Sequence, residues 1–65
     1  MSENGSTNSP SLEQRQAIFV ALLEAQDAGQ AVAPSRTAVA KQFGITVEDV
    51  KQIEKEGLDQ QWPPL

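Results

Sequence analysis

The sequence predicts an all-α domain of three helices, the second and third of which form a helix-turn-helix. Three observations support this fold class. Apolar residues recur with the period of an α-helix in three segments, hydroxyl side chains stand where those segments begin, and a glycine follows each of them. We expect a disordered tail over residues 1–10, the helix-turn-helix domain over residues 11–58, and an extended tail over residues 59–65 that packs on the core.

The first helix is predicted over residues 12–28. Ser11 can cap it, because its hydroxyl can accept a hydrogen bond from the first turn, and Gln14 lies where a capping box places its second member. Gly29 ends the helix. The preceding residues 1–10 are rich in Ser, Asn and Gly and cannot bury enough surface to offset the entropy of ordering. The apolar stripe of the helix consists of Leu12, Ile18, Phe19, Leu22 and Leu23.

The second helix is predicted over residues 36–43, after a connector at residues 30–34. Pro34 restricts the residue before it to extended conformations, so we expect a non-helical connector. Ser35 then follows as the N-cap of the helix. Val32 is expected to tuck under the first helix, so that the connector adds a small apolar contact to the domain.

A tight turn is predicted to join the second helix to a third helix over residues 47–56. Gly44 suits a helix end with positive φ, which glycine adopts at no steric cost. Ile45 fills the corner between the two helices. Thr46 can cap the third helix through its hydroxyl, with Asp49 as the capping-box partner. These features lie in register and favour a helix-turn-helix over two unrelated helices.

The predicted core lies where the first helix covers the helix-turn-helix pair. Phe43 is the largest apolar side chain at the corner, and we expect its loss to unfold a domain this small. Gly57 ends the third helix, and the segment Trp62-Pro-Pro-Leu65 is expected to fold back and close the core. A free ligand segment for a partner is the alternative interpretation of this tail. The predicted core residues are Phe19, Leu22, Leu23, Val39, Phe43, Ile45, Val50 and Ile53.

Composition restricts the classes of function. Five Lys and Arg residues against nine Asp and Glu residues give a net charge of −4, which opposes contact with nucleic acid. The absence of Cys and His excludes disulfides and the usual zinc sites. Residues 17–23 form the longest apolar stretch and are far too few to cross a bilayer, and residues 1–10 lack the pattern of a signal peptide. We expect a cytoplasmic protein with no cofactor and no membrane association.

We also expect no enzymatic activity. The carboxylates that could pair for acid–base chemistry are Glu48 with Asp49, or Glu54 with Glu56. Charges placed in this way on a short helix are normally solvated. The sequence also has neither a glycine-rich loop that could cradle a phosphate nor enough length to form a deep pocket.

The segment between Val39 and Leu58 carries a family resemblance. It reads Val-Ala-Lys-Gln-Phe-Gly-Ile-Thr through the turn and Lys51-Gln-Ile-Glu54 in the third helix, with a leucine four residues on. Residues 36–58 thereby resemble region four of bacterial sigma-70 family factors, in which an Arg-Gln-Ile-Glu run occupies the corresponding place. The resemblance implies a helix-turn-helix that reads promoter DNA for RNA polymerase, and therefore a role in transcription.

The resemblance also implies which residues contact DNA. Family positions that match Glu48 and Gln52 contact base edges, where glutamine suits adenine and glutamate can accept from cytosine. Lys51 matches a basic position. Val47 and Asp49 depart from the family, which usually has arginines there, and this predicts weak DNA binding by a monomer. The candidate DNA-binding residues are Arg36, Thr46, Glu48, Lys51, Gln52 and Lys55.

Two functions stay open at this point. The first is a DNA-binding module of transcription regulation, which acts on double-stranded DNA through its third helix. The second is a protein-interaction module that binds RNA polymerase, a sigma factor or a second copy of itself, with Trp62 and Leu65 as contact residues. The exposed polar residues favour the first, whereas the acidic balance and the tail favour the second. A homodimer formed through the first helix would serve either function.

Overall fold

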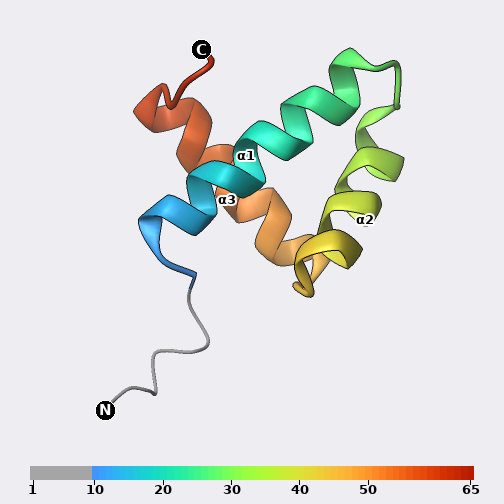
Figure 1. Cartoon of the computed structure of the whole chain (residues 1–65), viewed down its shortest axis with the longest axis horizontal. Coiled ribbons are helices and arrows are strands. Elements are labelled where there is room, and N and C mark those ends of the chain that lie inside the picture. Colours follow the sequence, from blue (N-terminus) through green and yellow to red (C-terminus); the bar gives the residue numbers. More distant parts are fainter. Residues whose placement is uncertain (1–9) are drawn as a thin grey trace.

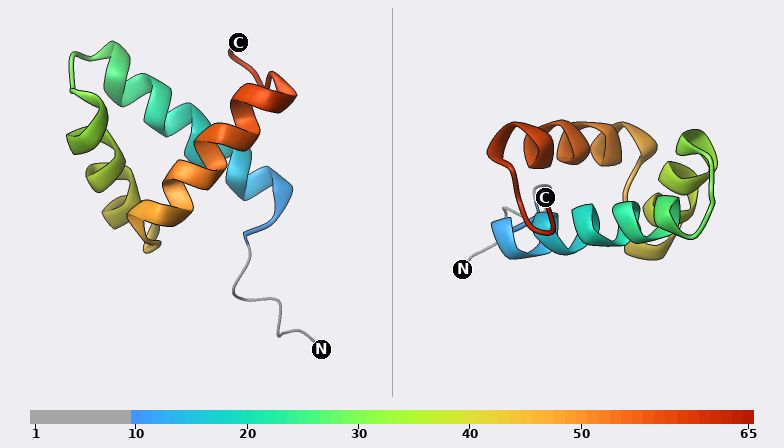
Figure 2. Two further views of the ribbon diagram at one scale, coloured as in Figure 1. Left: turned by 180° about the vertical axis from the view of Figure 1, so that it is seen from behind. Right: turned by 90° about the horizontal axis from the view of Figure 1, so that it is seen from above.

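The computed structural model describes residues 10–65, which form three helices and no strand. The helices are α1 (Leu12–Asp27), α2 (Val32–Phe43) and α3 (Val47–Gln60). α1 and α3 cross in two layers, and α2 lies to one side, where it packs against both (Figure 1, Figure 2). The predicted all-α fold is confirmed. Disorder is predicted over residues 1–10, of which residues 1–9 lie outside the described residues, while the Pro10 carbonyl accepts a hydrogen bond from Arg15.

Local hydrogen bonds form two of the helix starts as predicted. The Ser11 hydroxyl accepts a hydrogen bond from the backbone N–H of Gln14 at 3.1 Å. At the start of α3, the Thr46 hydroxyl accepts from the Asp49 N–H at 3.0 Å, and the Asp49 carboxylate accepts from the Thr46 N–H at 3.3 Å. Gly44 follows α2 with a φ of 69°. The turn between α2 and α3 is therefore built by the residues that the sequence indicates.

The start of α2 differs from the prediction, because the helix begins at Val32 rather than at residue 36. Pro34 lies in the first turn, where its missing N–H would have had no helical partner, so it does not break the helix. The N-cap is Ala31, and Ser35 is instead fully buried. The Ser35 hydroxyl donates to the Val32 carbonyl at 2.7 Å and accepts from the Gln26 amide at 3.2 Å, which ties α2 to α1. Val32 does not tuck under α1 and is 48% exposed.

The end of α3 also differs, because the helix continues through Gly57 to Gln60. Gly57 is buried against α1, and a Cβ atom there would overlap the aromatic ring of Phe19. Glycine at this position therefore permits a close helix crossing and does not end a helix. Gln61 ends the helix with a φ of 55°, so the tail predicted over residues 59–65 begins two residues later.

The core lies at the crossing of α1 and α3 and extends to α2. Phe19 is fully buried, and its ring meets Trp62 edge-on with the ring centroids 5.8 Å apart. The chain reverses after α3 through a hydrogen bond from the Trp62 N–H to the Gly57 carbonyl at 3.0 Å. Within the tail, Trp62 is buried at the core. The buried apolar residues are Ile18, Phe19, Leu22, Val39, Ala40, Val50, Ile53 and Trp62.

Three residues predicted for the core lie at its edge. Leu23, Phe43 and Ile45 are partly buried and pack against the buried cluster. Ile18 and Ala40 belong to the buried cluster instead, at 1% and 5% exposed. Phe43 thus contributes less buried area than the sequence indicates, whereas Phe19 is fully buried as predicted.

Candidate nucleic-acid interface

α3 has one buried side and one exposed side. Val50 and Ile53 are buried, whereas Lys51, Gln52 and Lys55 are exposed. This is the orientation that helical spacing predicts for residues one and four positions apart. We use the term α3 outer face for the exposed side chains of Glu48, Lys51, Gln52, Lys55 and Asp59.

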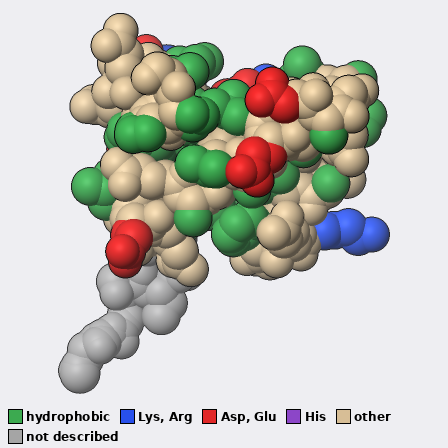
Figure 3. Space-filling view, turned by 45° about the horizontal axis from the view of Figure 1, so that its top comes forward, with side chains coloured by type: hydrophobic (Ala, Val, Ile, Leu, Met, Phe, Trp, Pro, Cys, Tyr) green, Lys and Arg blue, Asp and Glu red, His purple; other side chains and the backbone are tan. Residues whose placement is uncertain are grey.

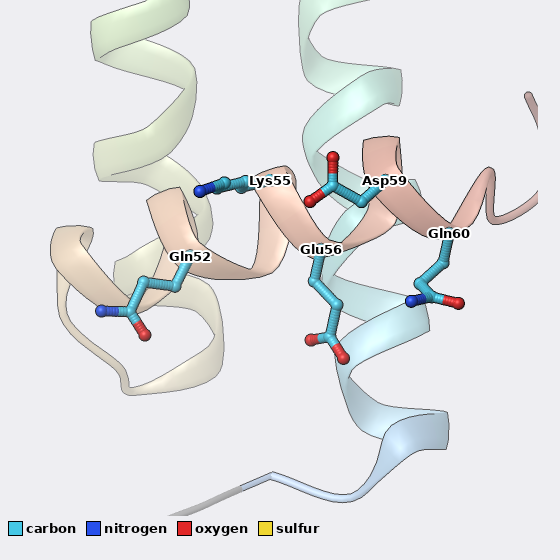
Figure 4. Close-up of a pocket in the computed structure, with 5 residues that line it drawn as sticks. All are labelled: Gln52, Lys55, Glu56, Asp59 and Gln60. Atoms are coloured by element: carbon cyan, nitrogen blue, oxygen red, sulfur yellow. The ribbon is translucent and has the colours of Figure 1, made fainter.

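A shallow depression lies along the second half of α3. It has a volume of about 410 Å³ and is lined by Gln52, Lys55, Glu56, Asp59 and Gln60 (Figure 4). All five side chains come from one helix, so no second wall encloses the depression. Sites for small molecules are usually concave and mostly apolar. The side chains that line this depression carry amide and charged groups.

Arg36, a predicted DNA contact, is engaged within the chain. Its Nε and Nη2 atoms donate to the same Oε1 atom of Glu54 at 2.9 and 2.7 Å, which joins α2 to α3. The two side chains are 25% and 17% exposed. No local pattern in the sequence indicates this pair, because the partners are 18 residues apart on different helices.

Arg15 makes the equivalent contact from α1. Its Nε donates to Oε1 of Glu56 at 2.9 Å, its Nη2 donates to Oε2 at 3.2 Å, and its Nη1 donates to the Pro10 carbonyl at 2.8 Å. The sequence does not indicate that Arg15 makes this pair. Its partner is 41 residues away, and a pattern within one helix cannot reveal such a contact. Because Glu56 lines the depression, the Arg15 guanidinium contacts one of its lining residues.

The remaining predicted contacts lie at or near the α3 outer face. Glu48 and Lys51 form an exposed pair with 3.7 Å between the carboxylate and the ammonium group, which solvent screens strongly. The Thr46 hydroxyl accepts the capping hydrogen bond and keeps its own proton to donate. Among residues 10–65, ion pairs involve Arg15, Arg36 and Lys51 but not Lys55.

The two tail residues proposed for a protein partner are separated by burial. Trp62 is 6% exposed and packs on the core, whereas Leu65 is 60% exposed. Leu58 on α3 is also exposed, at 52%. On the face seen in Figure 3, hydrophobic side chains are interspersed with acidic ones, and a cationic side chain projects from the edge. That face offers no continuous basic surface to a nucleic acid.

Residues 10–65 contain no group of His, Cys, Asp and Glu side chains arranged to hold a metal ion. In the same part of the chain, no helix combines the length and the apolar character needed to cross a bilayer. No protein-family model, curated protein or solved structure matches the chain.

Proposed function

We propose that this protein is a small helix-turn-helix module of transcription regulation, which contacts duplex DNA through the α3 outer face. One observation carries the proposal. After the capped turn at residues 44–46, α3 exposes Lys51, Gln52 and Lys55 together while Val50 and Ile53 bury the opposite side. A helix presented in this way fits the major groove, which admits one α-helix.

Some side chains of the α3 outer face can contact bases, and others can contact phosphates. The Gln52 amide can pair with both hydrogen-bonding groups of an adenine edge, and Glu48 can accept from a cytosine amino group. Lys51 and Lys55 can each contact a guanine edge or a phosphate. Thr46, at the start of α3, can donate its hydroxyl proton to a phosphate oxygen while it caps the helix.

Electrostatics predict that a monomer binds weakly. Two of the five Lys and Arg residues, Arg15 and Arg36, are held in ion pairs with 2.9 Å contacts, and Asp49 and Glu48 add negative charge at the start of α3. Affinity for DNA rises with the number of phosphates that cations neutralise. A second copy of the domain, bound to a second half-site, would multiply the weak contacts of each.

The test is binding to random-sequence duplex DNA at low and moderate salt, with the oligomeric state measured in parallel. Replacing both Lys51 and Lys55 with Gln removes two charges from the α3 outer face. We expect the affinity to fall at least about tenfold at low salt and the salt slope to drop by about two. The control replaces Gln14 and Gln30, which are exposed and lie outside α3, with Glu. It lowers the net charge equally, so an equal loss of affinity would refute a specific role for α3.

A second candidate function is a protein-interaction module. It is favoured by the exposed leucines Leu58 and Leu65 and by the net charge of −4. Its partner would be RNA polymerase, a sigma factor or another copy of this chain. Wild-type protein that binds no duplex at low salt, together with partner binding that is lost in a Leu58→Ser, Leu65→Ser variant, would favour this candidate over DNA binding.

A further inference from the structure

Two arginines lie beside α3, and each is held by a glutamate of that helix. Arg36 reaches Glu54 from α2, and Arg15 reaches Glu56 from α1. We propose that Glu54 and Glu56 set the DNA affinity of this domain by occupying guanidinium groups that would otherwise contact phosphates. The inference rests on the proposed DNA binding and names the residues that limit it.

The two arginine–glutamate contacts use the same donor groups that would bind a phosphate. A guanidinium group is planar and donates to carboxylate and phosphate oxygens with the same fork of N–H groups. Arg15 donates from two nitrogens to the two oxygens of Glu56, at 2.9 and 3.2 Å. Arg36 directs Nε and Nη2 to a single oxygen of Glu54, at 2.9 and 2.7 Å. Each carboxylate therefore stands where a phosphate oxygen would bind.

Both arginines contact glutamates of α3 and stay partly exposed. Glu56 lines the depression together with Gln52 and Lys55 (Figure 4), and Arg15 contacts both oxygens of its carboxylate. Glu54 lies on the side of α3 that faces α2, and Arg36 reaches it there from the first helix of the helix-turn-helix. The arginine side chains are 27% and 25% exposed, so a phosphate at the surface could reach them.

In the wild-type protein these arginines stay with their glutamates. A phosphate that captured Arg36 would leave Glu54, whose side chain is 17% exposed, as an unpaired and poorly solvated charge. The phosphate would also approach that carboxylate and be repelled by it. The cations available to DNA are therefore fewer than the sequence count suggests, although the helix-turn-helix is intact.

The experiment compares Glu54→Gln and Glu56→Gln with Glu24→Gln in the full-length chain, using a random-sequence duplex as the probe. Each change removes one negative charge, but Glu24 is exposed on α1 and makes no ion pair within residues 10–65. We expect the first two variants to bind about tenfold more tightly at low salt, with salt slopes steeper by about 0.9 each. The Glu24→Gln variant should change affinity by less than about twofold, because its charge is remote and screened.

A double variant identifies the source of the gain. Glu54→Gln combined with Arg36→Gln has the net charge of the wild type but lacks the released guanidinium, so its affinity should return to the wild-type level. An equal gain in Glu24→Gln, or a gain that survives the loss of Arg36, would overturn the inference and leave the proposed DNA binding intact. If neither the wild type nor any variant binds duplex DNA at low salt, the proposed function fails as well.

Thermal melting followed by circular dichroism shows whether each variant is folded. If Glu54→Gln unfolds, Glu56→Gln carries the test, because the Glu56 side chain is 38% exposed and tolerates the change more readily. Its paired variant is then Glu56→Gln with Arg15→Gln, and the same outcomes apply.

Discussion

The corner between α2 and α3 and the crossing of α1 over α3 are held together in different ways. At the corner, residues close in the chain are joined by hydrogen bonds between side chains and backbone N–H groups, with Thr46 and Asp49 as the reciprocal pair. At the crossing, residues far apart in the chain pack together, with Phe19 between Gly57 and Trp62. A cap contributes about 1 kcal/mol, whereas a buried aromatic ring contributes several. We infer that the corner sets the direction of α3 and that the crossing supplies most of the stability.

The largest expected effect follows from truncating the aromatic ring at the crossing. Phe19→Ala should destabilise the domain by about 3–5 kcal/mol, because Phe19 is fully buried and Trp62 loses its edge-on partner. A loss of this size is comparable with the whole stability of a small domain. We expect no cooperative thermal transition in this variant, measured by circular dichroism.

Phe43→Ala is the matched comparison at the corner. Phe43 is only partly buried, so its loss should cost roughly half as much as the loss of Phe19 and leave a cooperative transition at a lower temperature. The sequence alone predicts that Phe43→Ala unfolds the domain. If Phe43→Ala unfolds the protein and Phe19→Ala does not, the corner rather than the crossing holds the domain together.

The difference between local contacts at the corner and long-range contacts at the crossing also explains which parts of the fold the sequence could predict. The helix-turn-helix corner depends on residues within three or four positions of one another, and Gly44, Thr46 and Asp49 all act as predicted. The prediction that Gly57 ends the third helix is wrong. Gly57 instead permits contact with Phe19, which lies in another helix and cannot be identified from residues near Gly57 in the sequence. The prediction that Pro34 lies in a non-helical connector is also wrong. Proline is common both in connectors and in the first turn of a helix, and the local sequence does not distinguish the two.

For the candidate site, too, the sequence predicts features within one helix but not contacts between helices. Helical spacing correctly placed Lys51, Gln52 and Lys55 on an exposed side. It could not show that Arg36 is paired with Glu54, or that Arg15 is paired with Glu56, because both contacts join different helices. The sequence thus identifies which residues a helix exposes, and the tertiary structure decides which of their charges are available.

Gly57→Ala tests the close approach at the crossing. In an isolated helix alanine is preferred over glycine by about 1 kcal/mol. Here the new methyl group would overlap the buried ring of Phe19, and overpacking of this kind costs about 1–3 kcal/mol, so we expect a net loss of stability in chemical denaturation. Leu58→Ala, at the exposed neighbouring position, is the control and should change stability little.

A double-mutant cycle then attributes the loss to the ring. If the methyl group clashes with Phe19, the smaller side chain of Phe19→Leu should cost less in the Gly57→Ala background than in the wild type. Costs that simply add, or a Gly57→Ala variant more stable than the wild type, would show that α1 and α3 can separate slightly without loss.

The smallest expected effect lies at the corner itself. Thr46→Ala removes the hydroxyl that accepts from the Asp49 N–H at 3.0 Å, and it leaves that amide in the first turn of α3 without its cap. We expect a loss of about 1 kcal/mol, equivalent to a fall of about 4–8 °C in Tm for a domain of this size. Thr37→Ala on α2 is the control, because the Thr37 hydroxyl donates to the Ala33 carbonyl within an intact helix and caps no terminus. If Thr46→Ala also weakens DNA binding by more than its effect on folding explains, the cap fixes the direction of α3 for the proposed interface. Equal changes in the two threonine variants would instead show that the corner does not depend on its capping box.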